Sequence, residues 1–346
     1  MSPRVTIVTR TKNRPLLLAR ALQSVNAQTF RDYQHVIVDD ARNPEPIERM
    51  LEGLDSEGRD KVLLVASAEN TRREGVVYAG LSASHLQYLC IHDDDDTWEP
   101  HFLEKTVAWM DAHPEAGMVG VRCNLVKEKV EETEIVELEK APLRPELDSF
   151  TLLETSYANY VPPIAQLFRR ASVDRLGFWD SSLATQADWE FNLRMLADSP
   201  AGFLGEEPLA NWHHRRQSEN ELDNSVVSER SGHYNQNLLI RDSYLKRSLQ
   251  QGDTGMFATV LAQQVCIKTL REEMNEKLQN AEDSRQMIHA SLVKTILGQQ
   301  EQLSRLHEEL QEIKVANAEV LSVVKDLQSY QYRFRRRWNK LWGRGK

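Results

Sequence analysis

Four consecutive aspartates, Asp93 to Asp96, are the feature of this 346-residue sequence that most directly suggests chemistry. Adjacent carboxylates repel one another unless a cation or solvent offsets their charge. Alternate residues of an extended segment point to the same side, so Asp93 and Asp95 could hold a hard divalent ion together with a diphosphate. An isolated acidic run is more often a solvated turn, so both interpretations stay open for this run taken alone.

The residues before the aspartates alternate between short apolar runs and helix-like stretches, which is typical of βαβ units around a largely parallel sheet. Asp39 and the four aspartates each follow the end of an expected strand. Ligands of open α/β sheets bind in the crevice outside the carboxyl ends of strands, so these side chains are predicted to share one site. We expect strands at 5–9, 35–38, 62–66 and 88–91, and helices at 16–27 and 76–84.

The turn after the first expected strand excludes other nucleotide-binding folds. Residues 9–15 read TRTKNRP and contain no glycine. A dinucleotide-binding fingerprint and a phosphate-cradling P-loop both need glycines at this place. A hydride-transferring enzyme and a P-loop ATPase are therefore excluded. A nucleotidyltransferase, which would normally have a glycine-rich first turn with a lysine, is disfavoured for the same reason.

Three segments, in order along the chain, resemble motifs of family 2 glycosyltransferases. Residues 4–42 read RVTIVTRTKNRPLLLARALQSVNAQTFRDYQHVIVDDAR and resemble the opening strand, turn and helix of that family and its V-D-D strand end. Residues 92–103 read HDDDDTWEPHFL, similar to the family's metal motif, and residues 175–196 read RLGFWDSSLATQADWEFNLRML, similar to its later segment with the catalytic carboxylate. The resemblance implies a GT-A fold, a Rossmann-like mixed α/β sheet flanked by helices, and inverting transfer of a sugar from a nucleotide diphosphate.

The resemblance assigns the reaction to carboxylates. Asp188 matches the family's catalytic base, which takes the proton of the acceptor hydroxyl as its oxygen attacks the anomeric carbon. Asp95 is then the main ligand of Mn²⁺ or Mg²⁺, and Asp93 helps directly or through water, while the ion neutralises charge on the leaving diphosphate. His213 is a further metal ligand by analogy with some relatives, although it and His214 equally suit a surface or acceptor contact.

Other matched residues belong to nucleotide-sugar binding. Asp39 matches the aspartate that accepts a hydrogen bond from the pyrimidine base, and Thr11 lies in the turn that lines the same pocket. Asp94 is placed near the ribose, and Arg72 is a candidate partner of the diphosphate. A carboxylate accepts equally well from N3–H of uracil and of thymine. UDP and dTDP sugars are therefore both favoured as donors.

The sequence departs from the family pattern near these motifs. Ala187 stands where the family commonly has a Glu before the catalytic Asp, and Arg10 stands where proline is frequent. The usual Arg-Asn pair after Gly75 is also absent. The missing Glu is the argument for an alternative function, a non-catalytic coiled-coil adaptor that retains the glycosyltransferase fold. The aspartate run and Asp188 favour an active transferase that extends a cell-envelope polysaccharide or a lipid-linked glycan.

Charge and composition restrict the partners and the compartment. The first 330 residues carry a net charge of −16, whereas residues 331–346 carry +7. The acidic body argues against nucleic-acid binding, because a protein needs cations to replace the counterions of phosphates. No run approaches the ~18 apolar residues of a membrane span, and the N-terminal apolar run is too short for a signal peptide, so we expect a cytoplasmic protein. The three scattered cysteines predict no disulfide framework.

Composition divides the chain into a catalytic domain at 1–250, a helical coiled-coil region at 256–330 and a basic, aromatic, amphipathic tail at 331–346. Within the first part, the acidic segment 128–139 is expected to be an exposed hairpin or loop. In the second part, apolar residues recur at alternating steps of three and four from Leu303 onward, with Asn317 among them. This heptad pattern predicts a parallel homodimeric coiled coil in which a buried asparagine pair fixes the register.

The tail combines aromatic residues at steps of four with a high positive charge. Residues 331–346 contain five arginines and two lysines and no acidic residue. This combination is typical of an interfacial helix attracted to anionic lipid at the inner face of the cell membrane. Continuation of the coiled coil is the alternative interpretation. The aromatic residues at these steps are Tyr330, Phe334, Trp338 and Trp342.

Overall fold

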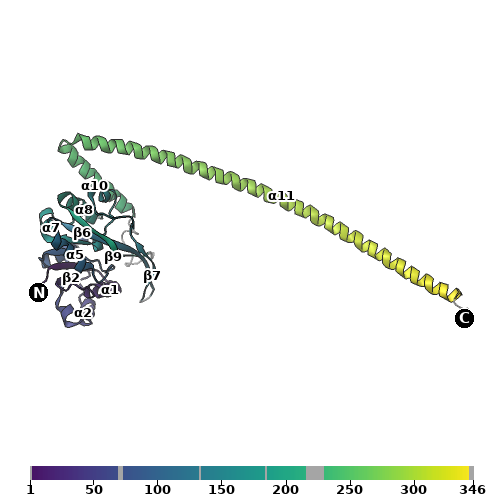
Figure 1. The fold of residues 1–346 in the computed structure, drawn as a ribbon, viewed down its shortest axis with the longest axis horizontal. Helices are drawn as coiled ribbons and strands as arrows, with labels where there is room; N and C mark the ends of the chain where they lie inside the picture. The colour runs from purple at the N-terminus through teal and green to yellow at the C-terminus, as the bar shows by residue number, and fades with distance from the viewer. Residues whose placement is uncertain (1, 69–72, 132–133, 184, 216–229, 343–346) are drawn as a thin grey trace. The chain divides into compact units, whose positions relative to one another are not determined.

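The computed structural model describes residues 2–68, 73–131, 134–183, 185–215 and 230–342. The chain divides into two compact units, Met1–Arg247 and Ser248–Lys346. The first unit is a sheet with helices on its faces, and the second consists almost entirely of one helix (Figure 1). The predicted fold class, a mixed α/β sheet flanked by helices with a long C-terminal helix after it, is confirmed.

The described residues of the first unit form a nine-stranded sheet of order β3-β2-β1-β4-β8-β6-β9-β5, with β7 paired to β6. Neighbours among β3, β2, β1 and β4 are parallel, whereas β8 is antiparallel to both β4 and β6. β6 and β9 are parallel, and β5 is antiparallel to β9. The strands are β1 (Val5–Thr11), β2 (Tyr33–Asp39), β3 (Val62–Ala66), β4 (Tyr88–Ile91), β5 (Thr97–Trp98), β6 (Met118–Glu131), β7 (Glu134–Pro142), β8 (Gln166–Arg169) and β9 (Ala201–Arg215).

Helices connect the strands and cover the sheet. In the first of them, Pro15 lies in the first turn, where its missing N–H is not needed, and the apolar residues from Leu17 to Val25 recur at helical spacing and are buried. The helices of this unit are α1 (Pro15–Asn26), α2 (Glu45–Glu52), α3 (Ser56–Asp60), α4 (Arg73–Ala83), α5 (Phe102–Ala112), α6 (Leu152–Tyr157), a 3-10 turn (Pro163–Ala165), α7 (Arg170–Leu176), α8 (Ala187–Asp198) and most of α10 (Arg230–Gln250).

Gly80 explains how closely α4 packs on the strands that carry the site. A Cβ atom at this position would lie 2.5 Å from Cγ1 of Val8 and 3.0 Å from Cγ2 of Val38. Val8 belongs to β1 and Val38 to β2, so the absent side chain lets the helix lie against both strands. Any larger residue at Gly80 would push α4 away from them, since both neighbours are buried.

The sequence predicted the first elements closely. β3 and β4 have the expected bounds, and β1, β2, α1 and α4 each differ from the expected bounds by one to three residues at an end. The hairpin expected within 128–139 is formed by β6 and β7. The prediction that it is exposed is wrong for its first residue, Glu128. Glu128 is 3% exposed because β6 pairs with β9 as well as with β7, which places this carboxylate inside the sheet region rather than in solvent.

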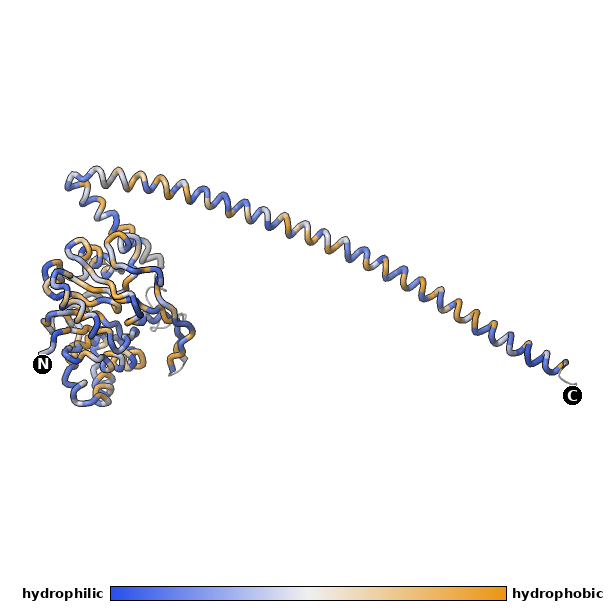
Figure 2. Tube along the Cα trace, in the orientation of Figure 1, coloured by the Kyte–Doolittle hydropathy of each residue, from blue (hydrophilic) through white to orange (hydrophobic). Residues whose placement is uncertain are grey.

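The second unit contains α11 (Thr254–Trp342), which is 89 residues long. Its apolar residues alternate with polar ones along the whole helix (Figure 2). The large apolar side chains described on it are exposed, among them Leu306 at 59%, Leu310 at 50% and Val324 at 42%. In the part of the chain that the structure describes, no helix combines the length and apolar content needed to cross a membrane.

Candidate active site

The turn after β1 and the turn after β4 meet because these strands are parallel neighbours, with Val8 paired to Ile91. Thr11 donates a hydrogen bond from Oγ1 to Oδ2 of Asp94 at 2.7 Å, and Arg14 donates to Oδ1 of the same carboxylate at 3.1 Å. Asn13, with φ of 53°, provides the left-handed residue between them. The structure therefore brings together two residues predicted for donor binding.

The aspartate run is not a solvated turn. Asp94, Asp95 and Asp96 are 4%, 8% and 3% exposed, and each has a partner in the protein. Burial raises the pKa of Asp94 to about 7, although Arg14 and Thr11 favour its ionised form. Burial also raises the pKa of Asp96, which accepts a hydrogen bond from the backbone N–H of His213. Removing water from four adjacent carboxylates requires compensating cations.

Arginines supply that compensation. Arg10 contacts both carboxylate oxygens of Asp93, at 2.7 and 3.2 Å. Oδ2 of Asp95 accepts a hydrogen bond from Arg215 and a longer one, of 3.4 Å, from Arg14. Bidentate and charge-assisted pairs of this kind are strong and fix the orientation of a carboxylate. The acidic run is consequently held in place before any ligand binds.

A second ionic cluster lies next to Asp95 and is centred on Glu128. This carboxylate accepts hydrogen bonds from Arg20 at 2.6 Å and from Arg215 at 2.5 Å, and it contacts Nδ1 of His213 at 2.7 Å. Burial alone would raise the pKa of Glu128, but the hydrogen bonds from His213 and Arg20 outweigh it and lower the pKa to about 2. Arg215 therefore bridges the two clusters, since it contacts both Glu128 and Asp95.

The two adjacent histidines of β9 differ in availability. Both ring nitrogens of His213 have partners, Nδ1 at Glu128 and Nε2 at Oγ1 of Thr97, 2.9 Å away. Nε2 of His214 is buried and has no hydrogen-bond partner among the described residues. Burial lowers the pKa of His214 to about 4, so its ring is neutral at pH 7. A neutral imidazole with an unused nitrogen is a donor suited to a metal ion.

Asp39 presents an unused oxygen at the end of β2. Its Oδ1 accepts the backbone N–H of Ala41 at 2.9 Å. Its Oδ2 is buried and has no hydrogen-bond partner within the described residues. A buried carboxylate oxygen without a partner is costly, so this atom is poised to accept from a ligand N–H.

Asp188 lies in the first turn of α8. Gln186, with φ of 65°, precedes it in a left-handed conformation that a glutamine adopts only under local constraint. Oδ2 of Asp188 accepts a hydrogen bond from Nδ2 of Asn159 at 2.8 Å, and Oδ1 of Asn159 accepts from Asn192 at 3.0 Å. Two amides in series thus orient this carboxylate.

Some predicted site features remain without a structural counterpart. Arg72 lies outside the described residues. Among the residues that the structure describes, no three His, Cys, Asp or Glu side chains converge in an arrangement that could hold a metal ion. Asp93 and Asp95 are engaged by arginines, and the role of His213 as a ligand stays a prediction.

Sequence reasoning missed the residues that neutralise the acidic run. Arg14 was present in the quoted turn motif and Arg215 directly follows the two histidines, so both could have been noticed as cations near carboxylates. Nothing local in the sequence indicates Arg20, Glu128 or Asn159, because their partners are 108, 87 and 29 residues away.

Comparison with known proteins identifies similar glycosyltransferases. Residues 6–176 match the family model described as glycosyl transferase family 2. The uncharacterized glycosyltransferase YwdF of Bacillus subtilis is 24% identical over 204 residues, covering 56% of this chain and 69% of that protein. The succinoglycan biosynthesis protein ExoW of Rhizobium meliloti is 34% identical over 96 residues, covering 26% of this chain and 28% of that protein.

A solved structure shows the same fold. The structure of residues 1–349 of TarS from S. aureus in complex with UDP-GlcNAc has a TM-score of 0.50 and 16% identity, covering 62% of this chain and 60% of that one. The chain thus spans less than two thirds of the length of ExoW and of the TarS fragment. Residues 6–176, which carry β1 to β4 and the aspartate run, are therefore a glycosyltransferase family 2 segment.

Proposed function

We propose that this protein is an inverting, metal-dependent glycosyltransferase that moves a sugar from a UDP or dTDP sugar to an acceptor hydroxyl. The observation that carries the proposal is the buried Oδ2 of Asp39, which has no hydrogen-bond partner among the described residues. Asp39 lies at the carboxyl end of β2, within the segment that matches glycosyl transferase family 2. This oxygen suits N3–H of a pyrimidine base. In this proposal Thr11 lines the base pocket, Asp94 lies near the ribose and Arg72 pairs with phosphate.

The residues present fit a divalent ion in part. Asp95 and Asp93 offer hard oxygen ligands, and the buried Nε2 of His214 is more available to an ion than the ring nitrogens of His213, which both have partners. Mn²⁺ or Mg²⁺ bound there would neutralise charge on the leaving diphosphate. Arg14 and Arg10 are partly exposed on the same carboxylates, so they are placed to share that charge with a ligand.

Asp188 is the proposed catalytic base. Transfer with inversion requires a carboxylate that takes the proton of the acceptor hydroxyl while the acceptor oxygen attacks the anomeric carbon. Asn159 holds Asp188 through Oδ2, which keeps its orientation fixed during this transfer. The diphosphate leaves from the opposite face of the sugar.

The acceptor is proposed to be a glycan or a lipid-linked glycan of the cell envelope. One relative is named for succinoglycan biosynthesis, which supports a polysaccharide acceptor. We assign catalysis to residues 1–250, dimerisation to a coiled coil at 256–330, and attachment at the inner face of the membrane to residues 331–346. A cytoplasmic enzyme with such a tail would meet acceptors that are themselves attached to lipid.

The test measures donor binding and turnover separately. Calorimetric titration of UDP, dTDP and GDP sugars with Mn²⁺ or Mg²⁺ should give binding of a pyrimidine donor. Asp39→Ala should weaken it by about tenfold or more, as expected for a hydrogen bond to a charged group, and Asp148→Ala, on an exposed segment, should not change it. Asp188→Ala should bind the donor normally and lose transfer. A wild type that binds no donor would instead favour the non-catalytic adaptor.

A further inference from the structure

The last residue of α6 carries an exposed aromatic ring, and the segment after it contacts the proposed base. Asn159 contacts Asp188, and Tyr157, two residues earlier, is 75% exposed. The ring of Tyr160 lies 6.3 Å from that of Tyr157, centroid to centroid, at an interplanar angle of 28°. An exposed aromatic ring thus lies two residues from the side chain that holds the proposed base.

The backbone of this segment is held firmly although the Tyr157 ring faces solvent. Trp189, which is buried beside Asp188, donates from Nε1 to the carbonyl of Thr155 at 2.6 Å. Arg241 donates to the carbonyl of Tyr157 at 2.8 Å. Such clamping removes the entropy cost of ordering the segment when a ligand binds, which is the physical basis of a preorganised binding surface.

The chemistry of this surface suits a saccharide. A pyranose ring has an apolar face of C–H groups and an edge of hydroxyls. Tyrosine offers a rigid apolar ring with a polar tip, and it loses little rotamer freedom on binding. The guanidinium of Arg144 lies 4.1 Å from the centroid of the Tyr160 ring, so N–H donors for hydroxyl groups stand next to the aromatic surface.

We propose that residues 157–160 form the acceptor-sugar subsite, with the exposed ring of Tyr157 as the face on which the saccharide stacks. This inference rests on the proposed function, because it takes Asp188 as the base. It adds that the acceptor is recognised by a sugar ring next to the reacting hydroxyl. Tyr157 is therefore a specificity-determining residue that contacts the acceptor and not the donor.

The experiment uses the full chain with Mg²⁺ and UDP, and it probes the acceptor side alone. Methyl β-glucoside, methyl β-galactoside and methyl β-N-acetylglucosaminide are titrated by saturation-transfer NMR. We expect at least one glycoside to bind, Tyr157→Ala to weaken it by about tenfold, and Tyr157→Phe to retain it within about twofold, because the ring and not the hydroxyl makes the stack. Leu153→Ala, a side chain 79% exposed on the same helix, should leave glycoside binding unchanged.

Three results would overturn the subsite: unchanged binding in Tyr157→Ala, an equal loss in Leu153→Ala, or a wild type that binds donor but none of the glycosides. Donor affinity is measured in the same variants and should be equal in all of them. Failure of the proposed function would give a different result in the measurement of donor binding. The wild type would then bind no nucleotide sugar, while glycoside binding that depends on Tyr157 would still support a saccharide site.

Discussion

At the scale of single residues, Asn159 should act on the reaction only through Asp188. Its amide fixes one oxygen of the proposed base, at 2.8 Å. We expect Asn159→Ala to lower kcat by about tenfold, since a misoriented base loses part of the positioning contribution, and to leave the KM for donor nearly unchanged. Steady-state kinetics with a transferable acceptor would check this split between kcat and KM.

The conservative variant makes the assignment sharper. Asn159→Ser keeps a short hydrogen-bond donor at the same position and should recover part of kcat. If Asn159→Ala instead raised the donor KM with kcat intact, or if both variants merely unfolded at lower temperature, the residue would have a structural role and not a positioning one. Circular dichroism on the same samples distinguishes these cases.

At the scale of elements, Glu128 on β6 forms ion pairs with Arg215 on β9 and with Arg20 on α1. Glu128→Gln removes the carboxylate partner of Arg20 and leaves the fully buried Arg215 with Asp95 as its one carboxylate among the described residues. Removing one member of a buried ionic network costs about 3–5 kcal/mol of folding free energy. Glu137→Gln, on the exposed strand β7, is the matched control and should change stability little.

The pH dependence of stability gives an independent readout of the same network. The folded pKa of Glu128 is about 2, below its ordinary value of 4.5. A depressed carboxyl pKa stabilises the fold above the unfolded value, and this stabilisation is lost as pH falls from about 4.5 toward 2. The difference in unfolding free energy between wild type and Glu128→Gln should therefore shrink across this window. A difference that stayed constant with pH would contradict the assignment.

Elements and their partners were not equally predictable. β3 and β4 could be predicted because short apolar runs bounded by polar residues define a strand locally. Parallel strands also placed Thr11 and Asp94 at one edge, as the sequence indicated. The exposure of Glu128 could not be predicted, because it depends on pairing between β6 and β9, whose residues Glu128 and Arg215 are 87 positions apart. A local charge pattern carries no information on such pairing.

At the scale of the whole molecule, α11 presents more apolar surface than a single helix would leave in water. Its exposed residues Leu306, Leu310 and Val324 belong to the three-four repeat that continues to Leu341. We expect the full chain to be a dimer in light scattering and Leu310→Glu to dissociate it, because a charge in the seam is desolvated. Val315→Glu is the control, since Val315 is 61% exposed but lies outside the repeat.

Asn317 adds a second test of the same interface. An asparagine pair in the seam specifies two parallel strands at a cost in stability. Asn317→Leu should therefore raise the thermal midpoint of α11 and allow higher oligomers. Unchanged mass and midpoint in Leu310→Glu and Asn317→Leu together would show that the repeat does not form an interface between copies of this chain.

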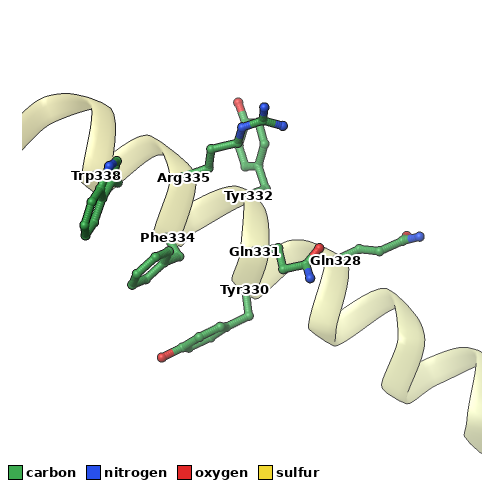
Figure 3. A pocket seen from close by; sticks show the side chains of 7 residues that line it. All are labelled: Gln328, Tyr330, Gln331, Tyr332, Phe334, Arg335 and Trp338. Atoms are coloured by element: carbon green, nitrogen blue, oxygen red, sulfur yellow. The ribbon is translucent and has the colours of Figure 1, made fainter. Parts of the chain in front are cut away.

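The end of α11 carries the aromatic and basic residues for which a membrane tail and a continued coiled coil are the two interpretations. Tyr330, Phe334 and Trp338 point from one side of the helix, whereas Tyr332 and Arg335 point from the opposite side (Figure 3). Tyr330, Phe334 and Trp338 are exposed to solvent, so they form an aromatic face on one side of the helix. Aromatic rings beside arginines would bury about 5–10 Å deep at a lipid interface.

We expect the full chain to sediment with vesicles that contain phosphatidylglycerol and not with vesicles of phosphatidylcholine alone, and to dissociate as salt is raised. Joint replacement of Phe334 and Trp338 by alanine should abolish sedimentation, while Tyr332→Ala, on the opposite side, should retain most of it. If the joint variant lost dimer stability and sedimentation stayed at its original level, these aromatic residues would belong to the coiled-coil seam, and attachment would require another part of the chain. If sedimentation failed and the dimer persisted, the tail would be the element that holds a catalytic unit near acceptors attached to lipid.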